Sequence, residues 1–218
     1  MTRALLLLLL AGSPALADRQ SFPPVDEAER DPTLVAFRDS LSASVAARDT
    51  KAVIAAVCPD IYLSHGGSGG PEEFLEYLDP ATGDAQEDQN RETYWNDLET
   101  TLSQPGYFDD EGEFWMPHQW QITLPASLDP FVTYFVTGQN VTLRQAAEPG
   151  APVLNQISHE IVIITNYRDD TDYQPVMLTD GTRGFMHRDF LWPMTGHRAA
   201  FVKSDTGDWQ LCTFVSGD

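Results

Sequence analysis

The spacing of apolar residues changes part-way along this chain, and this change constrains the fold more than any other feature. In the first half, apolar side chains recur every three or four residues, as at Leu34, Phe37 and Leu41, which is typical of one face of a helix. From Glu113 onward they alternate with polar residues, and β-branched and aromatic residues dominate, as in strands. The sequence therefore predicts an α+β protein with a helix-rich unit at residues 31–130.

Turn and capping residues divide both halves into short elements. Asp31-Pro32 and Asp49 are signals for helix starts, and Pro59 ends the second helix. The acidic stretch 79–90 is expected to be a loop. The predicted helices are 32–47, 50–58, 71–78 and 91–102, and the first strand candidates are 114–120 and 121–124. Six short strands should follow at 133–137, 141–144, 153–157, 160–166, 174–178 and 184–186, at a spacing that suggests a small barrel.

The last residues of the chain read as a hairpin. Residues 198–203 and 209–215 are apolar and β-branched, and the polar stretch 204–208 separates them. The sequence leaves two places for this C-terminal hairpin, residues 196–218. It packs either with the helix-rich unit or beside the barrel.

The first seventeen residues have the layout of a secretory signal peptide. Arg3 supplies a positive charge, residues 4–10 are apolar, and Ala15-Leu16-Ala17 is a cleavage site. Cleavage after Ala17 would leave a flexible, proline-containing lead-in at residues 18–30. No later stretch is long and apolar enough to cross a bilayer, so we expect a soluble periplasmic or secreted protein without membrane insertion.

Charge and cysteine content limit the partners and the redox compartment. The chain has 13 Lys and Arg against 33 Asp and Glu, a net charge of -20, which repels nucleic acid and anionic membrane surfaces. Its two cysteines, Cys58 and Cys212, are expected to form a disulfide in an oxidising compartment. Two buried free thiols are the alternative, because spacing alone does not place the cysteines side by side.

Residues 136–192 resemble the bacterial SH3 (SH3b) family in three segments that occur in the family's order. The segments are GQNVTLR at 138–144, APVL at 151–154 and DGTRGFMHRDFL at 180–191. Three positions depart from the family pattern, since Thr142, Phe185 and Phe190 stand where arginine, tryptophan and tyrosine are common. The resemblance implies an SH3-like barrel at residues 131–195.

The same resemblance implies ligand binding without chemistry. Members of this family often attach to peptidoglycan or to envelope proteins through aromatic side chains in a groove. The aromatic candidates here are Tyr167, Tyr173 and Trp192. Each of them could equally serve as barrel packing or as an isolated surface aromatic.

Residues 32–125 and 196–218 are similar to the cystatin-like cone of the nuclear transport factor 2 superfamily. The likeness rests on two opening helices followed by Asp60-Ile61-Tyr62-Leu63 and on the last hairpin. It implies that the barrel is inserted and that the hairpin returns to the helix-rich unit. Some cones hold an apolar pocket that transfers protons with an Asp–His pair, and the candidate lining residues here are Trp95, Trp115, His118 and Trp120.

Motifs for other enzyme classes fail on their context. Residues 66–70 fit G-x-S-x-G, but the sequence that follows is β-rich and lacks the repeated βαβ units of a parallel α/β sheet, so Ser68 is better explained as part of a flexible turn. The five histidines show no metal-ligand spacing, so no metal site and no cofactor are expected. We therefore expect a non-enzymatic binding or scaffold protein of the cell envelope. The rival is a small-molecule pocket protein or isomerase-like enzyme.

Overall fold

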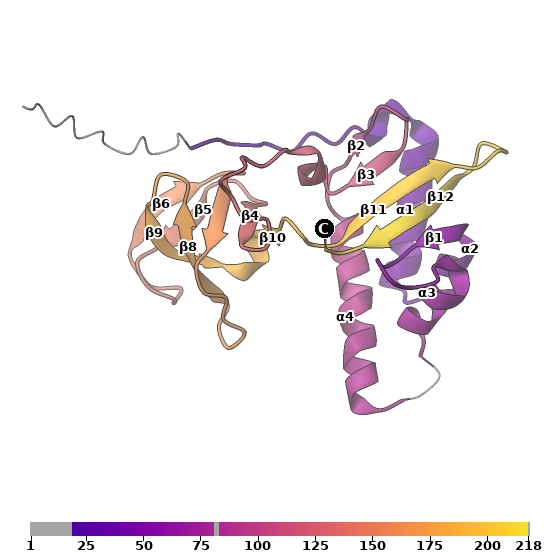
Figure 1. The fold of residues 1–218 in the computed structure, drawn as a ribbon, viewed down its shortest axis with the longest axis horizontal. Helices are drawn as coiled ribbons and strands as arrows, with labels where there is room; N and C mark the ends of the chain where they lie inside the picture. The colour runs from indigo at the N-terminus through magenta and orange to yellow at the C-terminus, as the bar shows by residue number, and fades with distance from the viewer. Residues whose placement is uncertain (1–18, 81–82, 218) are drawn as a thin grey trace, which may run out of the picture.

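The chain folds into two lobes that lie side by side (Figure 1). The computed structural model describes residues 19–80 and 83–217. The signal peptide predicted at residues 1–17, with its cleavage site after Ala17, lies outside the described residues. The helical lobe comprises residues 28–121 and 198–215, and the strand lobe comprises residues 133–193. This arrangement confirms the α+β class.

All of the α-helices in the described part of the chain belong to the helical lobe, and acidic N-caps set where three of them begin. Asp31, Asp49 and Asp84 each accept a hydrogen bond from a first-turn backbone N–H. The helices are α1 (Pro32–Ala46), α2 (Thr50–Ala55), α3 (Gly70–Leu78) and α4 (Ala85–Leu102), and a short 3-10 helix, η1 (Ala28–Arg30), precedes α1.

Helix α4 begins before the position that the sequence predicted. Residues 85–90 were expected to lie in a loop, yet they form its first turns. The Asp84 carboxylate accepts from the N–H groups of Gln86 and Glu87, and acidic residues in the first turn favour the positive end of the helix dipole. The acidity that suggested a loop therefore stabilises the helix start.

The C-terminal hairpin belongs to the helical lobe. Its strands β11 (Arg198–Lys203) and β12 (Trp209–Val215) lie inside a five-stranded sheet of order β1-β12-β11-β3-β2. The other members are β1 (Val57–Tyr62), β2 (Tyr107–Phe108) and β3 (Phe114–Met116). Strand β12 runs parallel to β1, with Val57 opposite Leu211. Of the two placements left open by the sequence, the return to the helix-rich unit is the one observed.

The strand prediction at 114–120 was too long, and the strand predicted at 121–124 was wrong. Strand β3 ends at Met116, and the 3-10 helix η2 (His118–Gln121) follows. Pro117 has no N–H to donate to a ladder, so the strand stops there. At the other end of the sheet, Val57 starts β1 rather than finishing the second helix.

The interior of the helical lobe is filled by large side chains. Helices α1 and α4 contact the hairpin strands (Figure 1), and the core between them is fully buried. Its largest members include Phe74, Trp95, Phe114, Phe201 and Phe214. These side chains fill the centre of the lobe.

A disulfide joins Cys58 of β1 to Cys212 of β12, as the sequence predicted. The two Cα atoms are 4.9 Å apart, and 154 positions separate the cysteines along the chain. The bridge therefore closes a loop that contains the whole strand lobe.

The strand lobe is one antiparallel sheet. Its order is β10-β4-β7-β8-β9-β5-β6, and η3 (Arg188–Phe190) leads into β10. The strands are β4 (Thr133–Val136), β5 (Val141–Arg144), β6 (Val153–Ile157), β7 (Ile161–Ile164), β8 (Tyr173–Leu178), β9 (Arg183–His187) and β10 (Leu191–Pro193). Its own core centres on Leu143, Val162 and Leu178.

The sheet does not close into the barrel that the sequence suggested. Strands β6 and β10 stand at its two ends, and within residues 19–80 and 83–217 they do not pair with each other. Strand β10 is three residues long, ends in Pro193 and lines a cavity facing the helical lobe. A strand this short that ends in proline, which has no N–H, offers little ladder for a further strand.

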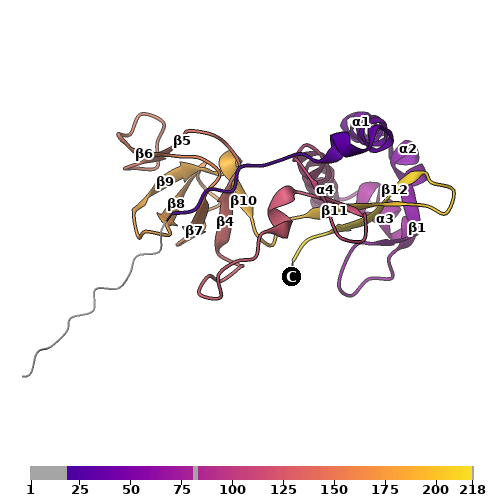
Figure 2. The ribbon, with the colours of Figure 1, turned by 90° about the horizontal axis from the view of Figure 1, so that it is seen from above.

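Two chain segments besides the return at 194–197 connect the lobes. The lead-in, residues 19–27, crosses from the strand lobe to α1 (Figure 2), bridging Ser21 to Glu160 at one end and bonding Glu27 N to Gly106 O at the other. Residues 122–132 link η2 to β4. Throughout the described ranges, no helix combines the length and the apolar character that crossing a bilayer requires.

Candidate functional site

The three aromatic residues suggested as ligand contacts lie in three different places. Tyr167 is 50 % exposed in the loop between β7 and β8. Tyr173 starts β8 and lies edge-on to His187, with ring centroids 5.1 Å apart. Trp192 is in β10 and faces the helical lobe. The structure therefore does not bring these three side chains into one groove.

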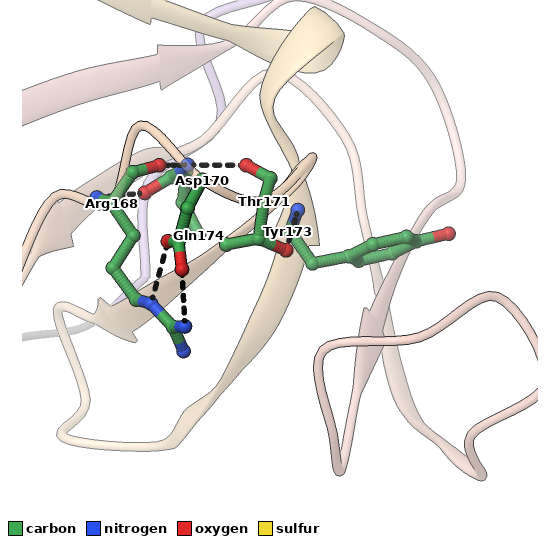
Figure 3. A network of polar contacts seen from close by, with 5 residues as sticks. All are labelled: Arg168, Asp170, Thr171, Tyr173 and Gln174. Atoms are coloured by element: carbon green, nitrogen blue, oxygen red, sulfur yellow. Dashed lines mark hydrogen bonds and ion pairs between the residues drawn. The ribbon is translucent and has the colours of Figure 1, made fainter.

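A buried glutamine holds the loop that presents Tyr173. The Gln174 amide donates to the carbonyl oxygens of Arg168 and Thr171, at 2.6 and 3.0 Å, and accepts from Arg168 N–H at 2.8 Å (Figure 3). Arg168 also pairs with Asp170. The Tyr173 ring points away from this network (Figure 3). The network therefore fixes the backbone from which the ring projects.

Tyr173 belongs to a hollow that we call the aromatic groove. It has a volume of about 240 Å³, and His187 and Phe190 line it beside Tyr173. The remaining lining residues are Val141, Thr142, Arg144 and Asp189. The His187 ring lies 6.3 Å from that of Phe190, and its Nδ1 atom lies 3.4 Å from the Asp189 carboxylate. Aromatic faces beside fixed polar groups are typical of ligand-binding surfaces.

A second hollow, the interlobe cavity, lies between α4 and β10 and has a volume of about 270 Å³. Helix α4 contributes Asp97 and Thr101, and the strand lobe contributes Arg188 and Trp192. His197 completes it from the chain that returns to β11. The cavity thus takes side chains from both lobes.

Asp97 and His197 face each other in this cavity. The His197 Nδ1 atom is 3.5 Å from an Asp97 carboxylate oxygen, and the imidazole stacks on Phe214 at 4.6 Å. Burial lowers the pKa of His197, although the carboxylate acts in the opposite direction. Burial likewise raises the pKa of Asp97. A neutral imidazole beside a carboxyl group can exchange a proton with a bound molecule.

The two hollows adjoin one another. Asp189 lines both, and the segment from His187 to Pro193 runs along them. Arg188 anchors this segment, because its N–H donates to Asp172 O at 2.7 Å and its guanidinium pairs with the Asp172 carboxylate at 3.0 Å. Together the hollows form one extended surface along the segment 187–197, which we call the 187–197 face.

The four residues suggested as pocket lining occupy separate environments. Trp95 is buried in the helical core, where its indole N–H donates to Leu78 O at 3.0 Å. The Trp115 indole donates to Asp109 at 2.8 Å. His118 is buried beside the lead-in, and burial lowers its pKa. The Trp120 ring lies 3.9 Å below the Arg198 guanidinium. The described structure therefore does not place them around a common space.

Sequence reasoning missed Asp97, Asp189 and His197. One hundred positions separate Asp97 from His197, and no local pattern links them. His187, Asp189 and Phe190 were visible only as the end of the SH3b-like motif. Their position in that motif was the one available signal.

The G-x-S-x-G segment at residues 66–70 leads into helix α3. The Ser68 hydroxyl donates to Glu73, which also accepts from Gly69 N–H, so the glycine loop is organised around the start of α3. Among the described residues, no cluster of three His, Cys, Asp or Glu side chains could hold a metal ion.

Comparison with protein-family models, with curated proteins and with solved structures found no match.

Proposed function

We propose that this protein is an exported binding protein of the cell envelope that recognises an extended ligand along the 187–197 face. The observation that carries the proposal is the adjoining pair of open hollows, which share Asp189. A ligand that occupies both must be elongated, as a polymer strand or an extended peptide is. The resemblance of residues 136–192 to SH3b domains favours peptidoglycan, with an envelope protein as the alternative.

Local charge is compatible with an anionic polymer. The whole chain carries a net charge of -20, which would repel such a ligand at long range. Two arginines and two aspartates line the hollows, namely Arg144, Arg188, Asp97 and Asp189. The face is therefore close to neutral, and its aromatic side chains can supply contact area without a charge penalty.

The disulfide supports export, because such bridges persist in oxidising compartments. The filled core of the helical lobe supports binding at the surface over chemistry in a cone-shaped pocket. In this proposal the helical lobe is the scaffold that presents the strand lobe.

Co-sedimentation of residues 18–218 with purified peptidoglycan sacculi, at low and high salt, tests the proposal. We expect salt-resistant pelleting that falls about tenfold in the double variant Tyr173→Ala, Phe190→Ala, because central aromatic contacts dominate binding energy. Tyr167→Ala is the matched control, since this exposed tyrosine is in the same lobe but outside both hollows. Equal pelleting of all variants, or none at either salt concentration, would refute recognition of peptidoglycan by this face.

The Asp97–His197 pair favours a second candidate function, a small-molecule pocket protein or an isomerase-like enzyme. Its site would be the interlobe cavity rather than the interior of the helical lobe. Asp97→Asn discriminates the two candidates. A binder of an extended anionic ligand should bind sacculi at least as tightly in this variant, because the lining loses one negative charge, whereas a proton-transferring pocket loses the carboxylate on which the imidazole depends.

A further inference from the structure

The strand lobe has a third hollow, the outer-face cavity, which shares no lining residue with the two hollows of the 187–197 face. Its volume is about 500 Å³, which is within the range of small-molecule pockets. The apolar side chains that line it are Phe22, Pro125, Leu128, Ile161, Ile163 and Met177. The polar side chains Gln20, Ser127 and Thr179 also contribute.

The floor of this cavity follows from the sequence of β7. Residues 161–164 are Ile-Val-Ile-Ile, an unbroken apolar run. Val162 and Ile164 belong to the core of the strand lobe, so by the two-residue period Ile161 and Ile163 lie on the opposite face. Ile163 pairs with Met177 of β8. A strand that is apolar on both faces is normally covered on both, yet no helix of the described chain covers this one.

The lead-in forms one wall and is held firmly. Arg19 donates to both carboxylate oxygens of Glu160 at 2.7 Å. Phe22 N–H donates to His159 O at 2.6 Å, and the Phe22 ring is edge-on to Phe135 with centroids 6.3 Å apart. The lead-in, which runs along the strand lobe (Figure 2), is therefore held to the sheet by a backbone hydrogen bond, an ion pair and a ring contact.

The linker forms the other wall. Leu128 N–H donates to Pro125 O at 2.9 Å, which closes a turn over residues 125–128. Asp129 O then accepts from the Thr133 hydroxyl at 2.7 Å and ties the turn to β4. Hydrogen bonds within the chain hold both walls in place, so binding needs little ordering of the chain.

The charges around the outer-face cavity indicate the kind of ligand that it would bind. Among the described residues that line the cavity, none has a charged side chain, and the nearby Arg19 forms an ion pair with Glu160. The chain as a whole is strongly acidic. We propose that the outer-face cavity binds an uncharged, hydrocarbon-rich small molecule, such as a neutral lipid chain, independently of the 187–197 face.

Displacement of the neutral fluorophore N-phenyl-1-naphthylamine by linear alcohols tests this site in the full mature chain. We expect the dissociation constant to fall about fourfold for each added methylene group until the cavity is filled. The alcohol should bind more tightly than the carboxylate of the same length, because none of the described lining residues is a cation. Dye binding that is absent, or that is unrelated to chain length, would overturn the proposal.

Two pairs of variants locate the binding. Ile163→Glu places a charge on the floor and should weaken binding at least about tenfold, while Leu154→Glu, at an exposed apolar position of β6, should have no effect. Ser127→Trp fills the cavity from the exposed linker without touching the sheet core, and Ala126→Trp is its control. Equal binding by Ser127→Trp and Ala126→Trp would contradict the assignment. So would a wild-type dimer that Ile163→Glu dissociates, because a second copy would then cover this face.

Discussion

The Cys58–Cys212 bridge should supply a large part of the stability of the helical lobe. It joins β1 to β12 across 154 positions of sequence, and the chain-entropy model assigns such a loop about 5 kcal/mol. Typical domains are stable by only about 5–15 kcal/mol. For a urea slope of about 2 kcal/mol per M, reduction should lower the unfolding midpoint by about 2.5 M.

Far-ultraviolet circular dichroism at the helical minimum is the appropriate probe, because every α-helix of the described chain is in the lobe that the bridge ties. Oxidised and reduced wild-type protein have identical side chains, so their difference isolates the covalent constraint. The double variant Cys58→Ala, Cys212→Ala controls for thiol reoxidation. A loss below about 1 kcal/mol would refute the loop-entropy argument for this chain.

Two further predictions concern the helical lobe alone. Burial lowers the pKa of His197 in the folded protein. As the pH drops below about 6.5, the usual histidine pKa, the unfolded chain therefore binds this proton before the folded one does. The free energy of unfolding should fall over that range, until the pH reaches the folded-state pKa. His197→Gln should flatten this decline in melting temperature, leaving the contribution of His118, and an unchanged slope would contradict it. Asp84→Ala should lower the free energy of unfolding by about 1 kcal/mol, because it removes the N-cap of α4. Urea unfolding measures this loss against the control Glu92→Ala, an exposed position in the middle of the same helix. An equal loss of stability in both variants would exclude a capping role for Asp84.

Local signals predicted most elements because their causes are local. The Asp31-Pro32 cap and the apolar period that follows set α1 within one residue of the predicted end. The hairpin strands agree with their predicted bounds, since alternation and a polar turn are sufficient to mark them. The prediction failed where one local signal competed with another. At residues 85–90 the acidic composition suggested a loop, but the Asp84 cap starts a helix there. After Met116 the β-forming residues suggested a longer strand, but Pro117 ends it.

The candidate site could not be assembled in the same way. Tyr167, Tyr173 and Trp192 were chosen for chemistry, yet the fold puts Tyr173 and Trp192 in two adjoining hollows and leaves Tyr167 in a loop outside both. Asp97 and His197 meet because β11 continues from the returning chain past α4. That proximity depends on where the hairpin packs. The residues next to Asp97 or His197 in the sequence do not determine this position.

The sequence by itself determined the α+β class, the starts of α1, α2 and α3, and the hairpin, because these follow from periodicity and capping within a few residues. The tertiary structure decided that the hairpin pairs with β1 and β3, that the strand-lobe sheet stays open, and that three hollows form around it. Each of these outcomes is a competition between contacts distant in sequence. Such contacts are selected by burial and loop closure over the whole chain, so no single segment specifies them.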